Sequence, residues 1–210
     1  MASTPSYNPN KIIQKPNRDY WNSILENDLS PLTYRCIQGL YAPGSTFKMI
    51  VAIAGLIHGA IDTNTTHFCD GKIGLGDRLY HCWKNNGHGS MNVKNAIKES
   101  CDVFFYEISK KIGIDKIAKV AQDFGLGQIY DLPLSNQKKG IIPSKEWKKQ
   151  NYDESWHPGE TLISAIGQGF VLTNPLQLAI MTSIIASDGK NIKPNICLLY
   201  TSQSPRDNKA

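Results

Sequence analysis

Long apolar runs are missing from this sequence of 210 residues. A helix that spans a bilayer needs about 20 consecutive apolar residues, and the longest apolar stretch, Met49 to His58, is much shorter. A basic segment followed by an apolar one, which would mark a signal peptide, is also missing from the N-terminus. We therefore expect neither a membrane span nor a secretion signal within the sequence.

Strong charge of one sign is missing as well. Lys and Arg number 23 against 18 Asp and Glu, which gives a net charge of +5. The basic residues are scattered, whereas nucleic-acid-binding proteins usually gather them on one face, so we expect no nucleic-acid partner. With 40% apolar and 20% charged residues, the composition is that of one globular domain with a sizeable core.

Closely spaced Cys-x-x-Cys pairs are absent, although the chain has five cysteines. Three of them and one histidine have the spacing Cys69-x12-Cys82-x5-His88-x12-Cys101. Thiolate and imidazole groups suit tetrahedral zinc. On spacing alone, buried free thiols or one disulfide remain open alternatives.

Helical periodicity dominates the rest of the chain. A strongly apolar helix is expected over residues 45–60, with Gly59 as its C-cap. Residues 61–90 are expected to be loop with little sheet, and residues 126–152 to be polar and rich in turns. Apolar residues at helical spacing predict further helices at residues 19–26, 92–100, 103–113, 115–124, 160–166 and 175–187.

The most informative residues open the apolar helix. Ser45 is followed three positions later by Lys48, and residues i and i+3 share one face of a helix. A serine hydroxyl is a weak nucleophile that needs a neighbouring base, and a lysine amine can act as one where apolar surroundings favour its neutral form. The alternative is an ordinary helix start, with Ser45 as N-cap and Lys48 solvated.

A second polar pair lies between two expected amphipathic helices. Ser100 and Asp102 are two positions apart, far along the chain from Ser45. A short link between packed helices can direct two polar side chains into one cleft, where Ser100 could relay a proton and Asp102 could hold Lys48 or substrate. The alternative is that both residues cap the helix that follows.

Ser-x-x-Lys together with a second serine motif is typical of penicillin-binding proteins and class A β-lactamases. From about Ala2 to Ile196, this chain resembles the transpeptidase domain of class B penicillin-binding proteins, most of all the penicillin-binding protein 2 subfamily. The second motif reads Ser-x-Asp here, where most relatives have Ser-x-Asn. The resemblance rests on Ser3-Thr-Pro-Ser-Tyr-Asn-Pro-Asn, Gln38-Gly-Leu-Tyr-Ala-Pro-Gly-Ser-Thr-Phe-Lys, Glu99-Ser-Cys-Asp-Val-Phe-Phe-Tyr, Gly167-Gln-Gly and Thr173-Asn-Pro-Leu-Gln.

The resemblance implies a mixed α/β (α+β) transpeptidase fold, with helices around an antiparallel sheet. It implies that Ser45 attacks the penultimate D-alanine carbonyl of a peptidoglycan stem peptide and that Lys48 takes the serine proton. Ser100 and Asp102 would support proton transfer and substrate binding, and the backbone N–H of Ser45 would form half of an oxyanion hole. β-Lactams would acylate the same serine.

The resemblance also implies a cellular setting. Full-length relatives are anchored in the bacterial inner membrane, with this domain on the periplasmic face, and act in cell-wall elongation. Their partners there are a glycosyltransferase and other membrane proteins of the elongation complex. We therefore expect an anchor and a pedestal domain to precede Met1 in a longer parent protein.

Some members of the resembled subfamily bind zinc beside the active site. Relatives often have carboxylates at the first two ligand positions, where this chain has cysteines, and cysteine is also a good zinc ligand. His81 and Asp70 remain open as substitutes for one ligand. Since Cys101 lies between Ser100 and Asp102, the metal would fix the catalytic loop. Matched by position, the ligands are Cys69, Cys82, His88 and Cys101.

A third family motif, Lys-Thr-Gly or Lys-Ser-Gly, does not occur in the sequence. In the family it lies on a central strand beyond the helix that begins with Thr-x-Pro-Leu-Gln. We therefore expect residues 1–196 to be a partial transpeptidase domain without its C-terminal strands, inactive and poorly soluble alone. Residues 197–210 resemble a translated DNA-library adapter, so we expect a non-native tail, with a genuine polar tail as the alternative.

Three other functions remain open. A β-lactamase or D,D-carboxypeptidase shares Ser-x-x-Lys and would release its acyl group to water rapidly. A penicillin-sensing domain would acylate once and signal. A structural zinc module would keep its function after Ser45→Ala.

Overall fold

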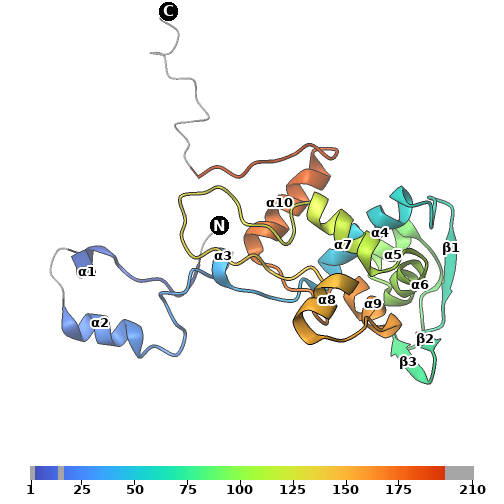
Figure 1. Ribbon diagram of the computed structural model, residues 1–210, viewed down its shortest axis with the longest axis horizontal. Coiled ribbons are helices and arrows are strands. Elements are labelled where there is room, and N and C mark those ends of the chain that lie inside the picture. Colours follow the sequence, from blue (N-terminus) through green and yellow to red (C-terminus); the bar gives the residue numbers. More distant parts are fainter. Residues whose placement is uncertain (1–2, 14–16, 197–210) are drawn as a thin grey trace, which may run out of the picture.

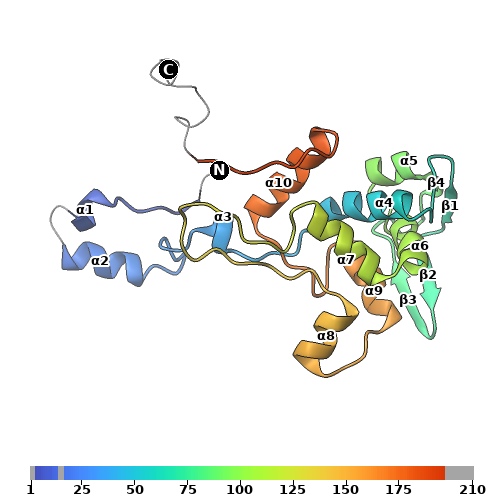
Figure 2. The ribbon, with the colours of Figure 1, turned by 45° about the horizontal axis from the view of Figure 1, so that its top comes forward.

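The computed structural model describes residues 3–13 and 17–196. An extended N-terminal part leads into a helical body (Figures 1 and 2). In the N-terminal part, the side chain of Asn17 accepts hydrogen bonds from the backbone N–H groups of Asp19 and Tyr20 and so starts the second helix. The helices of this part are α1 (Asn10–Ile13), α2 (Arg18–Leu25) and α3 (Arg35–Gln38).

The core of the body lies around two apolar helices. A 3-10 turn, η1 (Gly44–Phe47), leads directly into α4 (Lys48–Ile57), and α4 packs against α6 (Asp102–Ile112). Each fully buried aliphatic or aromatic side chain contributes roughly 1.5–3 kcal/mol. The side chains of these two helices with no exposed surface include Ile50, Val51, Phe104, Phe105 and Ile108.

Five further helices complete the body. Helix α9 packs on α6, and α7 packs on α4. Two of the five begin with a proline at the first turn, where a missing N–H costs nothing. The helices are α5 (Val93–Lys98), α7 (Ile114–Asp123), α8 (Lys145–Tyr152), α9 (Pro158–Ala165) and α10 (Pro175–Ala186).

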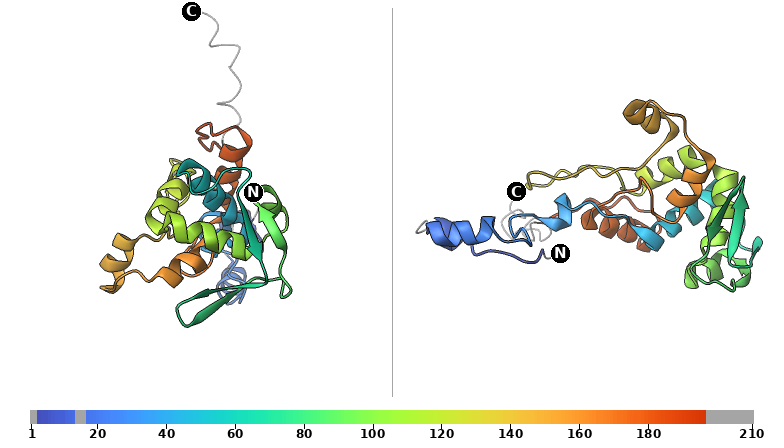
Figure 3. Two further views of the ribbon diagram at one scale, coloured as in Figure 1. Left: turned by 90° about the vertical axis from the view of Figure 1, so that its right-hand side faces the viewer. Right: turned by 90° about the horizontal axis from the view of Figure 1, so that it is seen from below.

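Two small antiparallel sheets lie against α6 at one end of the body (Figure 3). Strand β1 (Thr66–Cys69) pairs with β4 (Gly89–Asn92), and β2 (Lys72–Leu75) pairs with β3 (Arg78–His81). The first pairing places Cys69 opposite Gly89, so that the end of one strand faces the start of the other. The sheets thus bring residues 69–89 next to the start of α6.

The predicted mixed α/β transpeptidase fold is confirmed, and the helices agree with those expected to within a few residues. Two local expectations are wrong. Four strands of four residues each lie within residues 66–92, where a loop with little sheet was expected up to residue 90, and strands this short show little alternation. Helix α8 lies in the segment expected to be turn-rich, and its sequence Lys-Glu-Trp-Lys-Lys-Gln-Asn-Tyr has no apolar stripe.

The expected non-native tail, residues 197–210, lies outside the described residues. Within the part of the chain that the structure does describe, no helix combines the length and apolar character needed to cross a membrane.

Candidate active site

Ser45 lies exposed in the η1 turn, and this turn is held by a distant glycine loop. The backbone N–H of Gly44 donates to the carbonyl of Gly167 at 2.9 Å. Gly167 has a φ of +70°, and a Cβ built there would lie 2.2 Å from the oxygen of Gly44. Only glycine therefore fits this close approach, which explains how the Gly167-Gln-Gly stretch helps to place Ser45.

Lys48 is buried at the first position of α4, with 2% of its surface exposed. Its Nζ donates to the carbonyl and the Oγ of Ser100, both at 2.9 Å, and to Oδ1 of Asp102 at 2.5 Å. The alternative of a solvated Lys48 is therefore wrong. The same holds for Ser45 as an N-cap, since that position is Pro43 in η1 and Phe47 in α4.

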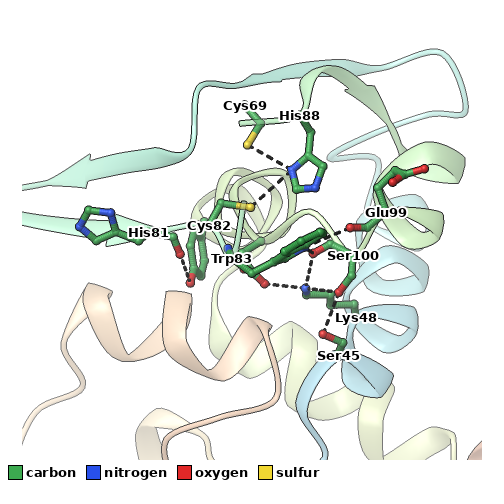
Figure 4. A network of polar contacts seen from close by, with 11 residues as sticks. Ser45, Lys48, Cys69, His81, Cys82, Trp83, His88, Glu99 and Ser100 are labelled. Atoms are coloured by element: carbon green, nitrogen blue, oxygen red, sulfur yellow. Dashed lines mark hydrogen bonds and ion pairs between the residues drawn. The ribbon is translucent and has the colours of Figure 1, made fainter. Parts of the chain in front are cut away.

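Ser100 connects Lys48 to Ser45, as Figure 4 shows. Its Oγ accepts from the Nζ of Lys48 and donates to the Oγ of Ser45 at 2.8 Å. A protonatable amine is thus linked to an exposed hydroxyl through one intervening hydroxyl. This arrangement can move a proton between the two ends of the chain without bulk water.

The backbone at Ser100 is left-handed, with a φ of +53°. It occupies the position after the C-cap of α5, where the Ser100 N–H donates to Ile97 and the Cys101 N–H donates to Ala96. In this Schellman ending the left-handed residue is usually glycine. A serine there costs on the order of 1 kcal/mol, and the strain aims its hydroxyl at Ser45.

Asp102 is the first residue of α6, and both of its carboxylate oxygens accept hydrogen bonds. Oδ1 accepts from Lys48, and Oδ2 accepts from the backbone N–H of Trp83 at 2.9 Å. The N-cap of α6 is Cys101, which makes no side-chain capping bond. The alternative that Ser100 and Asp102 serve as helix caps is therefore wrong.

Three cysteines and one histidine meet beside this loop. The Sγ atoms of Cys69 and Cys82 lie 3.6 Å and 3.5 Å from Nδ1 of His88. Ligands bound to zinc at about 2.3 Å for sulfur and about 2.0–2.1 Å for nitrogen lie about 3.5 Å apart in a tetrahedron. The cluster includes neither His81 nor Asp70. Its four ligand atoms, which all lie within 4.8 Å of one another, come from Cys69, Cys82, His88 and Cys101.

The chemistry of the cluster fits a bound cation. Cys69, Cys82 and Cys101 form no disulfide, so the disulfide alternative is wrong for these three cysteines. Burial, with smaller contributions from the nearby thiols of Cys69 and Cys82, raises the pKa of the Cys101 thiol to about 12. Several thiolates in one buried site are unfavourable without a compensating ion, and zinc supplies two positive charges.

Sequence reasoning missed Trp83, which bridges the cluster and the serine loop. It directly follows Cys82, and its indole N–H donates to the carbonyls of Glu99 and Ser100 at 3.1 Å and 3.0 Å. Its ring also meets the edge of the His88 ring at 5.3 Å between centroids. The one signal in the sequence was its position next to a candidate ligand.

Three known proteins are similar to this chain over most of its length. The Peptidoglycan D,D-transpeptidase MrdA of Acinetobacter baumannii is 37% identical over 198 residues, which are 93% of this chain and 30% of that protein. PBP2 of Pseudomonas aeruginosa, solved in complex with WCK 5153, is 38% identical with a TM-score of 0.89, over 92% of this chain and 44% of the solved one. PBP2 of Helicobacter pylori, solved in complex with MreC, is 37% identical with a TM-score of 0.86, over 89% of this chain and 35% of the solved one.

The chain therefore spans only part of its relatives, about 30% of the curated one. The family model described as "Penicillin binding protein transpeptidase domain" matches residues 1–209. The chain belongs to the family of penicillin-binding protein transpeptidase domains.

Proposed function

We propose that this chain is part of a peptidoglycan D,D-transpeptidase whose nucleophile is Ser45. The single observation that supports this most is the hydrogen-bond chain from buried Lys48 through Ser100 to exposed Ser45. In a transpeptidase family, a serine activated in this way suits a stem peptide that ends in D-alanyl-D-alanine.

In the proposed acylation, the Ser45 oxygen attacks the penultimate D-alanine carbonyl. The serine proton passes through Ser100 to the neutral amine of Lys48, and then to the nitrogen of the departing D-alanine. The C–N bond breaks, and an ester to Ser45 forms. The amine of a second stem peptide next attacks this ester, the cross-link forms, and Ser45 regains its proton. Asp102 holds Lys48 in place by accepting a hydrogen bond from its amine.

Zinc is proposed at the cluster of Cys69, Cys82, His88 and Cys101, on the basis of its geometry and donor set. When bound, the metal would supply a structural cross-link rather than chemistry at the reacting carbonyl. Cys101 lies between Ser100 and Asp102 in the sequence, so a fixed position of Cys101 limits the movement of both neighbours.

The setting proposed for the parent protein is the periplasmic face of the inner membrane, in cell-wall elongation. The H. pylori relative was solved with MreC, which supports a partner of the elongation complex. A glycosyltransferase is proposed as a second partner. Residues 1–196 are proposed to be a partial domain that needs the rest of the parent, including a Lys-Thr-Gly or Lys-Ser-Gly motif, for activity.

The test uses the complete parent protein, labelled with a fluorescent penicillin and then supplied with a stem pentapeptide and an acceptor amine. We expect a long-lived acyl-enzyme, release of D-alanine and a cross-linked product, all abolished by Ser45→Ala. The control is Ser90→Ala, at an exposed position on β4, which should behave as wild type. Rapid hydrolysis of the acyl-enzyme would assign a hydrolase instead, and a stable acyl-enzyme without product would assign a sensor.

A further inference from the structure

Trp83 contacts the catalytic loop with two separate donors. Its backbone N–H donates to Oδ2 of Asp102. Its indole N–H donates to the carbonyls of Glu99 and Ser100 (Figure 4). The side chain is 63% exposed, so burial of its ring explains little of its placement. What fixes the side chain is polar contact with the residues around Ser100.

The carbonyls that accept from the indole belong to the two residues after α5, its C-cap Glu99 and then Ser100. The last carbonyls of a helix have no partner within the helix and must find one elsewhere. The Ser100 carbonyl accepts from both Lys48 and Trp83, which approach it from α4 and from the segment after β3. These two donors fix the orientation of a peptide whose residue has the unfavourable φ of +53°.

The orientation of this peptide determines where the Ser100 hydroxyl points. That hydroxyl lies 2.8 Å from the Ser45 oxygen and 2.9 Å from Lys48 Nζ, so a small rotation of the peptide breaks both contacts. Trp83 is itself held by the neighbouring Cys82, which lies buried in the cluster. The indole therefore links the position of the cluster to that of the proton-transfer chain.

We propose that Trp83 is a positioning residue for acylation, which keeps the Ser100 peptide in its strained, productive conformation. This inference rests on the proposed function, because it concerns the step in which Ser45 attacks. A positioning role affects the rate constant of acylation, whereas a substrate-contact role affects the affinity of the first, non-covalent complex.

The test is Trp83→Phe in the complete parent protein, which removes the indole N–H and keeps an aromatic ring. We expect the acylation rate constant for a penicillin to fall on the order of tenfold, since one neutral hydrogen bond is lost. The dissociation constant of the non-covalent complex should stay within about twofold. The matched control is Trp156→Phe, whose indole donates to Thr161 away from the loop at 2.8 Å, and it should leave both constants unchanged.

Amide hydrogen exchange supplies a second readout that needs no acylation. Trp83→Phe should speed exchange at Ser100 and Cys101, whose N–H groups close the end of α5, and Trp156→Phe should not. Zinc content and melting temperature are measured on each variant to confirm folding.

Several results would overturn the inference: unchanged acylation in Trp83→Phe, an equal loss in Trp156→Phe, a weaker non-covalent complex with an unchanged rate constant, or unchanged exchange at Ser100. If the wild-type protein forms no acyl-enzyme at Ser45, the proposed function fails. The exchange measurement then still decides whether Trp83 holds the loop.

Discussion

Two lysines in this molecule are buried to the same extent, yet their surroundings differ. The side chains of Lys48 and Lys148 are each 2% exposed, and each meets a carboxylate at 2.5 Å, from Asp102 and from Glu160. Lys148 has a second carboxylate, Glu154, at 3.4 Å, whereas Lys48 has the hydroxyl and carbonyl of Ser100. Burial and ion pairing are therefore common to both lysines, and what sets Lys48 apart from Lys148 is its connection to an exposed hydroxyl.

The difference follows from where each lysine lies. Lys148 is on α8 and ties this polar helix to the start of α9, where Glu160 also accepts from the His157 backbone. The charge of Lys148 is paired with the carboxylates of Glu154 and Glu160, and the pair with Glu160 connects α8 to α9. Lys48 opens α4 beside the exposed η1 turn, so its amine reaches the surface through a single serine.

The largest expected effect is on acylation when each lysine is replaced by methionine. Lys48→Met removes the base and should lower the rate of penicillin acylation by at least about a thousandfold. Lys148→Met should leave that rate within about twofold, while lowering the melting temperature because Glu160 loses its partner. Stopped-flow acylation and calorimetry of the complete protein measure the two effects. Equal losses of acylation in the two variants would remove the distinction between them.

A second change distinguishes the role of the Ser100 hydroxyl in acylation from the effect of its strained backbone on stability. Ser100→Gly removes the relay and should slow acylation about a hundredfold, yet it should stabilise the fold by about 1 kcal/mol because glycine accepts a positive φ. The control is Asp153→Gly at the end of α8, where φ is +54°, which should gain stability without any change in acylation. Urea unfolding and acylation kinetics test both variants, and a fully active Ser100→Gly would show that the relay is unnecessary.

A third change tests the cluster, whose Cys101 lies in the sequence between Ser100 and Asp102, the two residues that Lys48 contacts. Cys101→Ala should abolish binding of the one zinc ion that the wild-type protein is expected to hold, and should cost several kcal/mol of unfolding free energy. Cys36→Ala, at a buried cysteine outside the cluster, should keep the zinc. Elemental analysis after dialysis distinguishes them, and zinc retained by Cys101→Ala would exclude this ligand set.

The smallest effect is a pH dependence at Lys148. Its hydrogen bond to Glu160 raises the pKa of Lys148 above the usual 10.5, against the opposing effect of burial, and Glu154 adds to the rise. Because the pKa is raised in the folded state, the ion pair stabilises fully below the ordinary value and stops contributing as pH rises through the raised one. Between pH 9 and about 11.5, the free energy of unfolding measured with urea should fall more steeply for wild type than for Lys148→Met. If the two proteins lose unfolding free energy in parallel over this range, the result would argue against this ion pair.

The candidate site residues could be predicted from the sequence, because the resemblance matches them to family motifs. Ser45, Lys48 and Ser100 were predicted together, and the structure brings them into one hydrogen-bonded chain. The route of that chain could not be predicted, since it depends on the left-handed backbone of a serine where glycine is usual. Helix propensity does not indicate the left-handed backbone of Ser100, because tertiary contacts impose this conformation.

Other features were beyond sequence reasoning for different physical reasons. The strands of residues 66–92 are stabilised by pairing and by the cluster, so their local patterns are weak. In the sequence, Trp83 cannot be told from any other aromatic residue. Its proposed positioning role depends on one indole N–H group that is directed at two carbonyls, and only the structure shows this. Helix α8 depends on Ser144 as its N-cap, on the ion pair of Lys148 and on ring contacts of its two aromatic residues with Phe170, none of which shows as a helical apolar pattern.

The most direct test of the account is the mass of the complete parent protein after reaction with benzylpenicillin, followed by peptide mapping. The account predicts one added penicilloyl group, located on the peptide that contains Ser45 and absent from Ser45→Ala. An adduct on another residue, or an adduct that persists in Ser45→Ala, would contradict the assignment of Ser45 as the nucleophile.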